Sequence, residues 1–133
     1  MKLKDKYNEV KRNFPDSIVL LLSGSFYVTY GMDSLLISYL FSYQIKNDKV
    51  GFPIAVLEKV LATLQHKHIH YVIEQEDRLE LQEGKNNYFS QLEEAQKFYN
   101  NQTMLDSLVG RIRLLVLKDS NNYFKIKEFI DEL

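Results

Sequence analysis

The sequence predicts an α/β fold, with a mixed β-sheet flanked by helices and a helical extension at the C-terminal end. Up to about residue 74, segments with apolar residues at helical spacing alternate with short β-branched and aromatic runs. After residue 88 the apolar residues recur mainly at helical spacing. With 133 residues, 45% of them hydrophobic, the chain has the size of one domain. We expect an α/β domain over residues 1–87 and a helical extension over 88–133 packed on it as a single compact unit.

The first part of the chain predicts a helix followed by a β-hairpin. Apolar side chains recur at gaps of three and four residues, as on one face of a helix: Leu3, Tyr7, Val10 and Phe14. Pro15 is expected to end this helix, because the residue before a proline is disfavoured in helical conformation. Two apolar runs, residues 17–22 and 26–30, then flank a turn that contains glycine, which is typical of a hairpin. The first run is apolar at successive positions and therefore predicts a central strand buried on both faces.

The next segment predicts a helix and a short strand. Asp33 is expected to cap the N-terminus of a helix over residues 34–41 by accepting a backbone N–H. Residues 43–46 are expected to form a short strand. Gly51-Phe52-Pro53 is expected to break the regular structure.

A second helix and strand follow this break. A leucine-rich helical pattern covers residues 54–67, and a β-branched run predicts a strand over 69–73. The polar segment 74–87 has only a weak pattern. Within it, Leu79 and Leu81 alternate and allow an edge strand.

The last third of the chain predicts helices. A helix begins at Tyr88, and Thr103 with Asp106 resembles the capping box of a further helix. Residues 111–117 fit the helical stripe and also fit a strand, so both readings stay open. A final short helix is expected over residues 126–133.

Composition and charge exclude several classes of protein. Seventeen Lys and Arg against eighteen Asp and Glu leave a net charge of −1, which excludes a strongly basic nucleic-acid binder. The chain has no cysteine, so disulfides, thiolate metal sites and cysteine nucleophiles are excluded, and the composition fits a cytoplasmic protein. No phosphate-loop motif, signal peptide or membrane-spanning apolar run is found. We therefore expect no nucleotide site, no cofactor and no membrane association.

Two clusters of chemically active side chains are candidates for a metal or catalytic site. His66, His68 and His70 alternate and could hold a metal on one strand face, but His66 belongs to the end of a helix, which favours an electrostatic role there. The acidic segment 74–83 could hold the divalent metal of a nuclease, but its polarity favours a solvated surface. The sequence thus predicts no metal site, no catalytic residue and a non-enzymatic protein.

Basic side chains gather near both ends of the chain. One group comprises Lys2, Lys4, Lys6, Lys11 and Arg12, and the other Arg111, Arg113, Lys118, Lys125 and Lys127. Either group could contact phosphates, which supply most of the sequence-independent affinity for DNA. We favour the simpler interpretation that both are solvated helix faces.

An ordered set of short motifs runs from Tyr7 to Gln75. It consists of Pro15-Asp16, the strand residues Ile18-Val19-Leu20-Leu21, Gly24-Ser25-Phe26-Tyr27, Tyr30, Asp33-Ser34, Gly51-Phe52-Pro53, Leu57, Leu61, Leu64, Val72 and Glu74-Gln75. This order and spacing resembles the N-terminal mismatch-recognition domain of the MutS family of DNA mismatch repair proteins. The resemblance implies that family's α/β fold, and a recognition domain without the ATPase that full-length members carry.

The resemblance also implies a DNA-binding site at the hairpin. In the family, the Phe of a Phe-x-Glu motif wedges beside a mispaired base from the minor groove, and the Glu hydrogen-bonds that base. Here Phe26 occupies the wedge position and Val28 stands in place of the Glu, while Ser25 replaces an Asp and Leu22 an Arg. The implied DNA-binding residues are Ser23, Gly24, Ser25, Phe26, Tyr27 and Val28.

Two main functions remain open on the sequence, and a weaker third is that the chain is one piece of a split repair protein that works beside a separate ATPase subunit. The first is a DNA-binding module without strict mismatch specificity, because valine cannot accept a hydrogen bond from a base. The second is a protein-interaction module that has lost DNA contact and uses its apolar face. The candidate partners are accordingly double-stranded DNA, another protein or a second copy of this chain.

Overall fold

A computed structural model describes residues 2–74, 80 and 82–133. The chain divides into two compact units, residues 1–96 and 97–133, and the boundary falls within one long helix. Within the described part of the chain, no helix is both long and apolar enough to cross a membrane.

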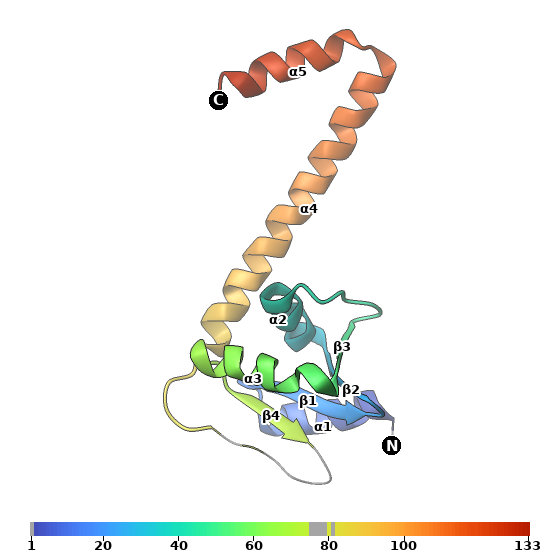
Figure 1. The fold of residues 1–133 in the computed structure, drawn as a ribbon. Helices are drawn as coiled ribbons and strands as arrows, with labels where there is room; N and C mark the ends of the chain where they lie inside the picture. Colours follow the sequence, from blue (N-terminus) through green and yellow to red (C-terminus); the bar gives the residue numbers. More distant parts are fainter. Residues whose placement is uncertain (1, 75–79, 81) are drawn as a thin grey trace. The chain divides into compact units, whose positions relative to one another are not determined.

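Unit 1, residues 1–96, is built on a four-stranded mixed sheet in the order β3-β2-β1-β4 (Figure 1). Strand β1 runs antiparallel to β2 and parallel to β4, and β3 runs antiparallel to β2. In chain order, the elements are α1 (Leu3–Asn13), β1 (Ile18–Ser23), β2 (Phe26–Tyr30), α2 (Gly31–Phe41), β3 (Lys49–Pro53), the 3₁₀ turn η1 (Ile54–Val56), α3 (Leu57–His66), β4 (Tyr71–Glu74) and the start of α4 (Tyr88–Lys118). The predicted α/β class is confirmed.

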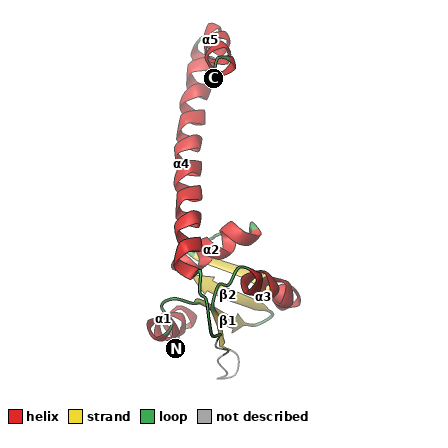
Figure 2. Cartoon of the chain, turned by 90° about the vertical axis from the view of Figure 1, so that its left-hand side faces the viewer, coloured by secondary structure: helices red, strands yellow, loops and turns green. Residues whose placement is uncertain are grey.

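Helices cover both faces of the sheet (Figure 2). On β1, Ile18 and Leu20 face a cluster built from α2, α3 and the first turns of α4, whereas Val19 and Leu21 face α1. Successive side chains of a strand point to opposite faces, so this central strand must be apolar at every position. The predicted central position of the first strand is confirmed.

Helix α1 and the hairpin form where the sequence predicts them. The last helical residue is Asn13, and Pro15 follows one residue after the cap. Strands β1 and β2 are joined by the two residues Gly24 and Ser25, with Ser23 opposite Phe26. Gly24 has φ +62°, a conformation that glycine adopts without a steric penalty and that matches the first position of a type II′ turn.

The expected cap at Asp33 is wrong. Helix α2 begins at Gly31, two residues before Asp33, and the aspartate side chain is fully buried. Its carboxylate accepts hydrogen bonds from other elements of unit 1, including the backbone N–H of Val19 at 3.1 Å. The aspartate is therefore a core residue that accepts a backbone N–H of β1 at Val19, outside the β1–β2 pairs formed by Leu21 to Ser23.

The region between α2 and α3 also differs from expectation. Residues 43–46 do not form the expected strand: Tyr43 lies stacked on Phe41 and Phe52, and Lys46 makes only an isolated bridge to Lys49. The expected break at Gly51-Phe52-Pro53 is instead the end of strand β3. A strand can accept this proline because β3 lies at the edge of the sheet.

The helix predicted over residues 54–67 is confirmed as η1 followed by α3, and the strand predicted over 69–73 is confirmed as β4, Tyr71–Glu74. Leu79 and Leu81, the basis of the expected edge strand, lie outside the described residues.

Unit 2, residues 97–133, contains the remainder of α4 and helix α5 (Asn121–Asp131). Residues 111–117 are helical, which decides between the two readings left open by the sequence. The expected capping box is wrong, because Thr103 lies inside α4 and its hydroxyl donates to the carbonyl of Tyr99 at 3.0 Å. The expected packing of the helical extension on the α/β domain stays a prediction.

Candidate functional site

The candidate site is the tip of the β1–β2 hairpin. Its turn is held from the neighbouring element, since the N–H of Ile54 donates to the carbonyl of Ser25 at 3.1 Å. Phe26 also lies opposite Pro53 in the β2–β3 register. The turn is thus supported on both sides by paired backbone, which gives Phe26 a defined position.

The six predicted DNA-binding residues divide into an exposed and a buried group. Gly24, Ser25 and Phe26 are exposed and Ser23 is half-buried, whereas Tyr27 and Val28 are buried. The Phe26 side chain is 47% exposed. The hairpin therefore presents one aromatic side chain beside its turn, with Ile54, 44% exposed, next to the turn.

Val28 lies on the same face of β2 as Phe26, but α1 covers it. Its exposed fraction is 3%, and it belongs to the cluster that contains Tyr7 and Leu21, with Val10 packed against it. Its neighbour on β3 is Gly51, where an added Cβ would lie 3.4 Å from a methyl group of Val28. The position two residues after the exposed aromatic is consequently part of the core.

A known protein family matches the part of the chain that contains this sheet and hairpin. The family model described as MutS domain I matches residues 2–99, more than half of the chain. The chain belongs to the MutS domain I family. The match extends beyond the motifs at Tyr7 to Gln75 and includes the beginning of α4.

Among curated proteins, the chain is similar to the DNA mismatch repair protein MutS of Flavobacterium psychrophilum. The two are 34% identical over 68 residues, which is 51% of this chain and 8% of the length of that protein. The chain therefore spans only a small part of this relative.

In this MutS domain I, the valine that stands in place of the family's Glu lies in an apolar environment. Val28, for which the resemblance implies the position of the family's Glu, is enclosed between α1 and the sheet. Leu22, at the position of the family's Arg, is half-buried and packs against the opposite cluster. Two of the three departures from the motif thus coincide with apolar packing inside unit 1.

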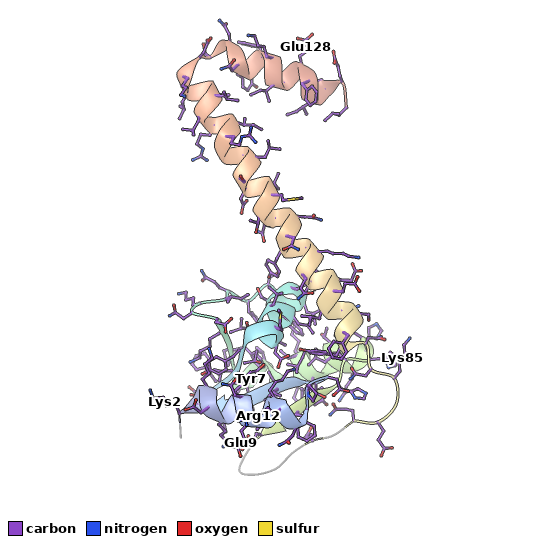
Figure 3. The ribbon with its side chains drawn as sticks, turned by 180° about the vertical axis from the view of Figure 1, so that it is seen from behind. Lys2, Tyr7, Glu9, Arg12, Lys85 and Glu128 are labelled. Carbon is purple, nitrogen blue, oxygen red and sulfur yellow. The ribbon has the colours of Figure 1, made fainter. Side chains whose placement is uncertain are left out.

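Most basic residues of α1 are paired with acidic side chains of unit 1. Lys4 lies 3.7 Å from a carboxylate oxygen of Asp48, and Lys6 lies 3.0 Å from one of Glu74. Lys11 points inward to Asp33, whereas Arg12 is exposed on the outer side of α1, the side that faces the viewer in Figure 3. The N-terminal basic group therefore does not form one continuous cationic surface.

A buried polar cluster holds α1, β1, α2 and the start of α4 together. Both oxygens of the Asp33 carboxylate are hydrogen-bonded: Oδ1 accepts from Lys11 Nζ at 2.8 Å and from the Tyr88 hydroxyl at 2.6 Å, and Oδ2 accepts from the Tyr7 hydroxyl at 2.6 Å and the Val19 N–H at 3.1 Å. Lys11 Nζ also donates to the Ser17 carbonyl at 2.6 Å. With its carboxylate fully paired, this cluster is a structural support for the sheet that carries the hairpin.

Sequence reasoning missed this cluster because its members are far apart along the chain. Tyr88 lies 55 residues after Asp33, and Lys11 22 residues before it. One signal was available: Lys11 is four residues after Tyr7 and adjoins the apolar stripe of α1, where an ammonium group needs a buried partner.

The three histidines do not form a metal cluster. In the described part of the chain, no group of three or more His, Asp or Glu side chains is placed to hold a metal ion. His68 has φ +57° in the turn after α3, and His70 Nε2 lies 3.1 Å from the Lys85 carbonyl. Residues 66–70 are thus no regular strand that would point the three imidazoles to one side.

We predict that Tyr7 and Tyr88 resist ionisation in the folded protein. Burial, and then the neighbouring Asp33 carboxylate, raise the pKa of both hydroxyls far above the usual value of 10.0. A group whose pKa is higher in the folded than in the unfolded state stabilises the fold below the unfolded pKa and loses that contribution as pH rises above it. Stability should therefore fall above about pH 10.

Ultraviolet titration of tyrosinate, combined with urea unfolding over the same pH range, checks this prediction. The wild-type protein should retain protonated tyrosines that ionise only on unfolding, and Tyr88→Phe should have one fewer of them. Complete ionisation of all tyrosines in the folded protein would contradict the burial of these hydroxyls.

Proposed function

We propose that this MutS domain I binds duplex DNA through the hairpin tip, with Phe26 as an apolar wedge, and that it does not distinguish a mismatched from a matched duplex. The exposure of Phe26 beside a supported turn is the observation that carries the proposal. The family relationship supports it, because the similar F. psychrophilum protein is a DNA mismatch repair protein.

A wedge needs a rigid base and a free aromatic face. Phe26 is paired with Ser23 on one side and Pro53 on the other, so its backbone is held while its side chain stays 47% exposed. Apolar side chains inserted between base steps from the minor groove unstack them and kink the duplex. A single aromatic residue at the tip is chemically sufficient for this contact.

We expect no preference for mismatched DNA because of Val28, two residues after Phe26. Val28 has no hydrogen-bonding group in its side chain, and its exposed fraction of 3% keeps it from a base. Three of the N-terminal lysines are also paired with carboxylates. We therefore expect weak binding that depends more on the wedge than on phosphate contacts.

Fluorescence anisotropy at low salt with a G·T-mismatched duplex and its matched control tests the proposal. Wild-type protein should bind both duplexes with equal affinity, and Phe26→Ala should weaken both about tenfold, since stacking of an aromatic ring on a base contributes about 1–3 kcal/mol. Phe89→Ala, which removes another exposed phenyl ring, should leave the affinity unchanged. No binding by the wild-type protein, or equal binding by Phe26→Ala, overturns the proposal.

The second candidate function is contact with a protein through the same tip. It is favoured by the apolar character of the exposed side chains there, Phe26 and Ile54, and by the pairing of the α1 residue Lys6 with Glu74. The two functions differ in one result. Contact with a protein predicts that Phe26→Ala leaves DNA affinity unchanged while it weakens capture of that partner.

A further inference from the structure

Unit 2, residues 97–133, has no core of its own. None of its residues is buried. Its exposed large apolar side chains are Phe98, Met104, Leu105, Leu108, Val109, Leu114, Leu115, Leu117, Tyr123, Phe124, Phe129, Ile130 and Leu133. Exposed apolar surface on this scale marks an interaction site, because helices in water are stabilised mainly by packing of an apolar face.

The apolar residues of α4 form a stripe with the spacing of a coiled-coil seam. Leu105, Val109, Ile112 and Val116 follow one another at gaps of four, three and four residues. The second half of this stripe faces α5, where Ile112 and Val116 line an open groove of about 260 Å³ together with Tyr123, Ile126, Lys127 and Ile130. The first half, Leu105 and Val109, is 57% and 46% exposed.

The two halves of the stripe fit each other when two α4 helices pair antiparallel. In the register that places Leu105 of one copy against Val116 of the other, Val109 meets Ile112, and both layers are apolar. The exposed half from each copy then covers the groove-lining half of the other. Leu108 and Leu115 flank the same seam on one side and also meet each other in this register.

The charges on the other side of the seam are complementary in the same register. Asp106 of one copy lies beside Arg113 of the other, and two-fold symmetry repeats this pair. Within one chain, the two residues are seven positions apart on a helix, about 10 Å along its axis, so they are not positioned to pair with each other. Asp106 and Arg113 can therefore form an ion pair only between two copies of α4.

We propose that residues 97–133 form a homodimer in which α4 pairs antiparallel with α4 of a second copy. Leu105, Val109, Ile112 and Val116 form the seam, Asp106 and Arg113 form ion pairs across it, and α5 of each copy flanks the seam beside Ile112 and Val116. The dimer thus brings together four helices, α4 and α5 from each copy. Each dimer carries two copies of unit 1, and the proposal does not depend on what unit 1 binds.

Charge reversal tests the register without disturbing the apolar seam. Light scattering and sedimentation equilibrium of the full chain should give twice the 15.7 kDa of one chain. Asp106→Arg and Arg113→Asp should each raise the dissociation constant of the dimer about tenfold, because each turns two attractive pairs into repulsive ones. The double variant, which exchanges the two charges, should restore wild-type affinity. Lys118→Glu, a charge reversal outside the paired positions, should have little effect.

A wild-type chain that stays monomeric at all concentrations overturns the proposal. The same result is expected if the helical extension binds unit 1 or a different protein instead of a second copy. A dimer that is insensitive to the charge reversals, or that the double variant does not restore, overturns the antiparallel register. Phe26→Ala should leave the mass at the dimer value, so failure of the DNA-binding proposal can be told apart from failure of this one.

Discussion

Replacing Asp33 by alanine is expected to lower the free energy of unfolding by about 3–5 kcal/mol, the range seen when one partner of a buried ion pair is removed. The carboxylate is fully buried and accepts four hydrogen bonds. Its loss leaves the Tyr88 hydroxyl and the Val19 N–H without this acceptor. The Lys11 ammonium loses its counter-charge and keeps the Ser17 carbonyl and the Tyr88 hydroxyl, and the Tyr7 hydroxyl keeps only the Tyr30 carbonyl. Urea denaturation monitored by circular dichroism measures the effect.

Two further variants keep this prediction testable if Asp33→Ala does not fold. Tyr88→Phe removes one of the four donors and should cost about 1–2 kcal/mol, because the carboxylate keeps three partners. Glu9→Gln changes an exposed carboxylate on the outer side of α1 (Figure 3) and should stay within about 0.5 kcal/mol of the wild-type protein. An Asp33→Ala variant as stable as Glu9→Gln would show that the carboxylate is not buried.

Restoring the family's Glu, as Val28→Glu, is expected to destabilise unit 1 strongly at neutral pH. Burial raises the pKa of a carboxyl group by up to about 3–5 units, so forcing the ionised form under α1 costs about 3–4 kcal/mol at pH 7. The cost should shrink as pH falls toward the unfolded pKa, because a raised pKa favours the folded state only while the group is protonated. Urea denaturation at several pH values between neutral and mildly acidic conditions checks both statements.

The matched control for this variant is Phe26→Glu. It places the same carboxylate on the same face of the same strand, two residues earlier, where the native side chain is 47% exposed. Its cost should be small and almost independent of pH. If the two variants are equally stable, Val28 is accessible, and the structural reason for the lack of mismatch preference fails.

Local pattern was sufficient to predict most elements of the sheet and its helices. The run Ile18 to Leu21 is apolar at successive positions, and only a central strand covered on both faces can bury all of it. Three local signals were also reliable: Gly24 for the hairpin turn, Pro15 for the end of α1 and the leucine stripe for α3. Each of them acts on the backbone of neighbouring residues. The strand expected over residues 43–46 was wrong because Tyr43 packs on Phe52, a contact that spacing along the chain does not reveal.

The sequence by itself determined that this chain has the hairpin and the ordered motifs of MutS domain I, with Phe26 kept and the Glu replaced by Val28. Only the tertiary structure decided that Phe26 is free and Val28 is covered, and that Asp33 is a buried acceptor instead of a helix cap. The reason is physical. Turn and helix signals act over a few residues, whereas burial depends on which distant segment, here α1 or the start of α4, covers a given side chain.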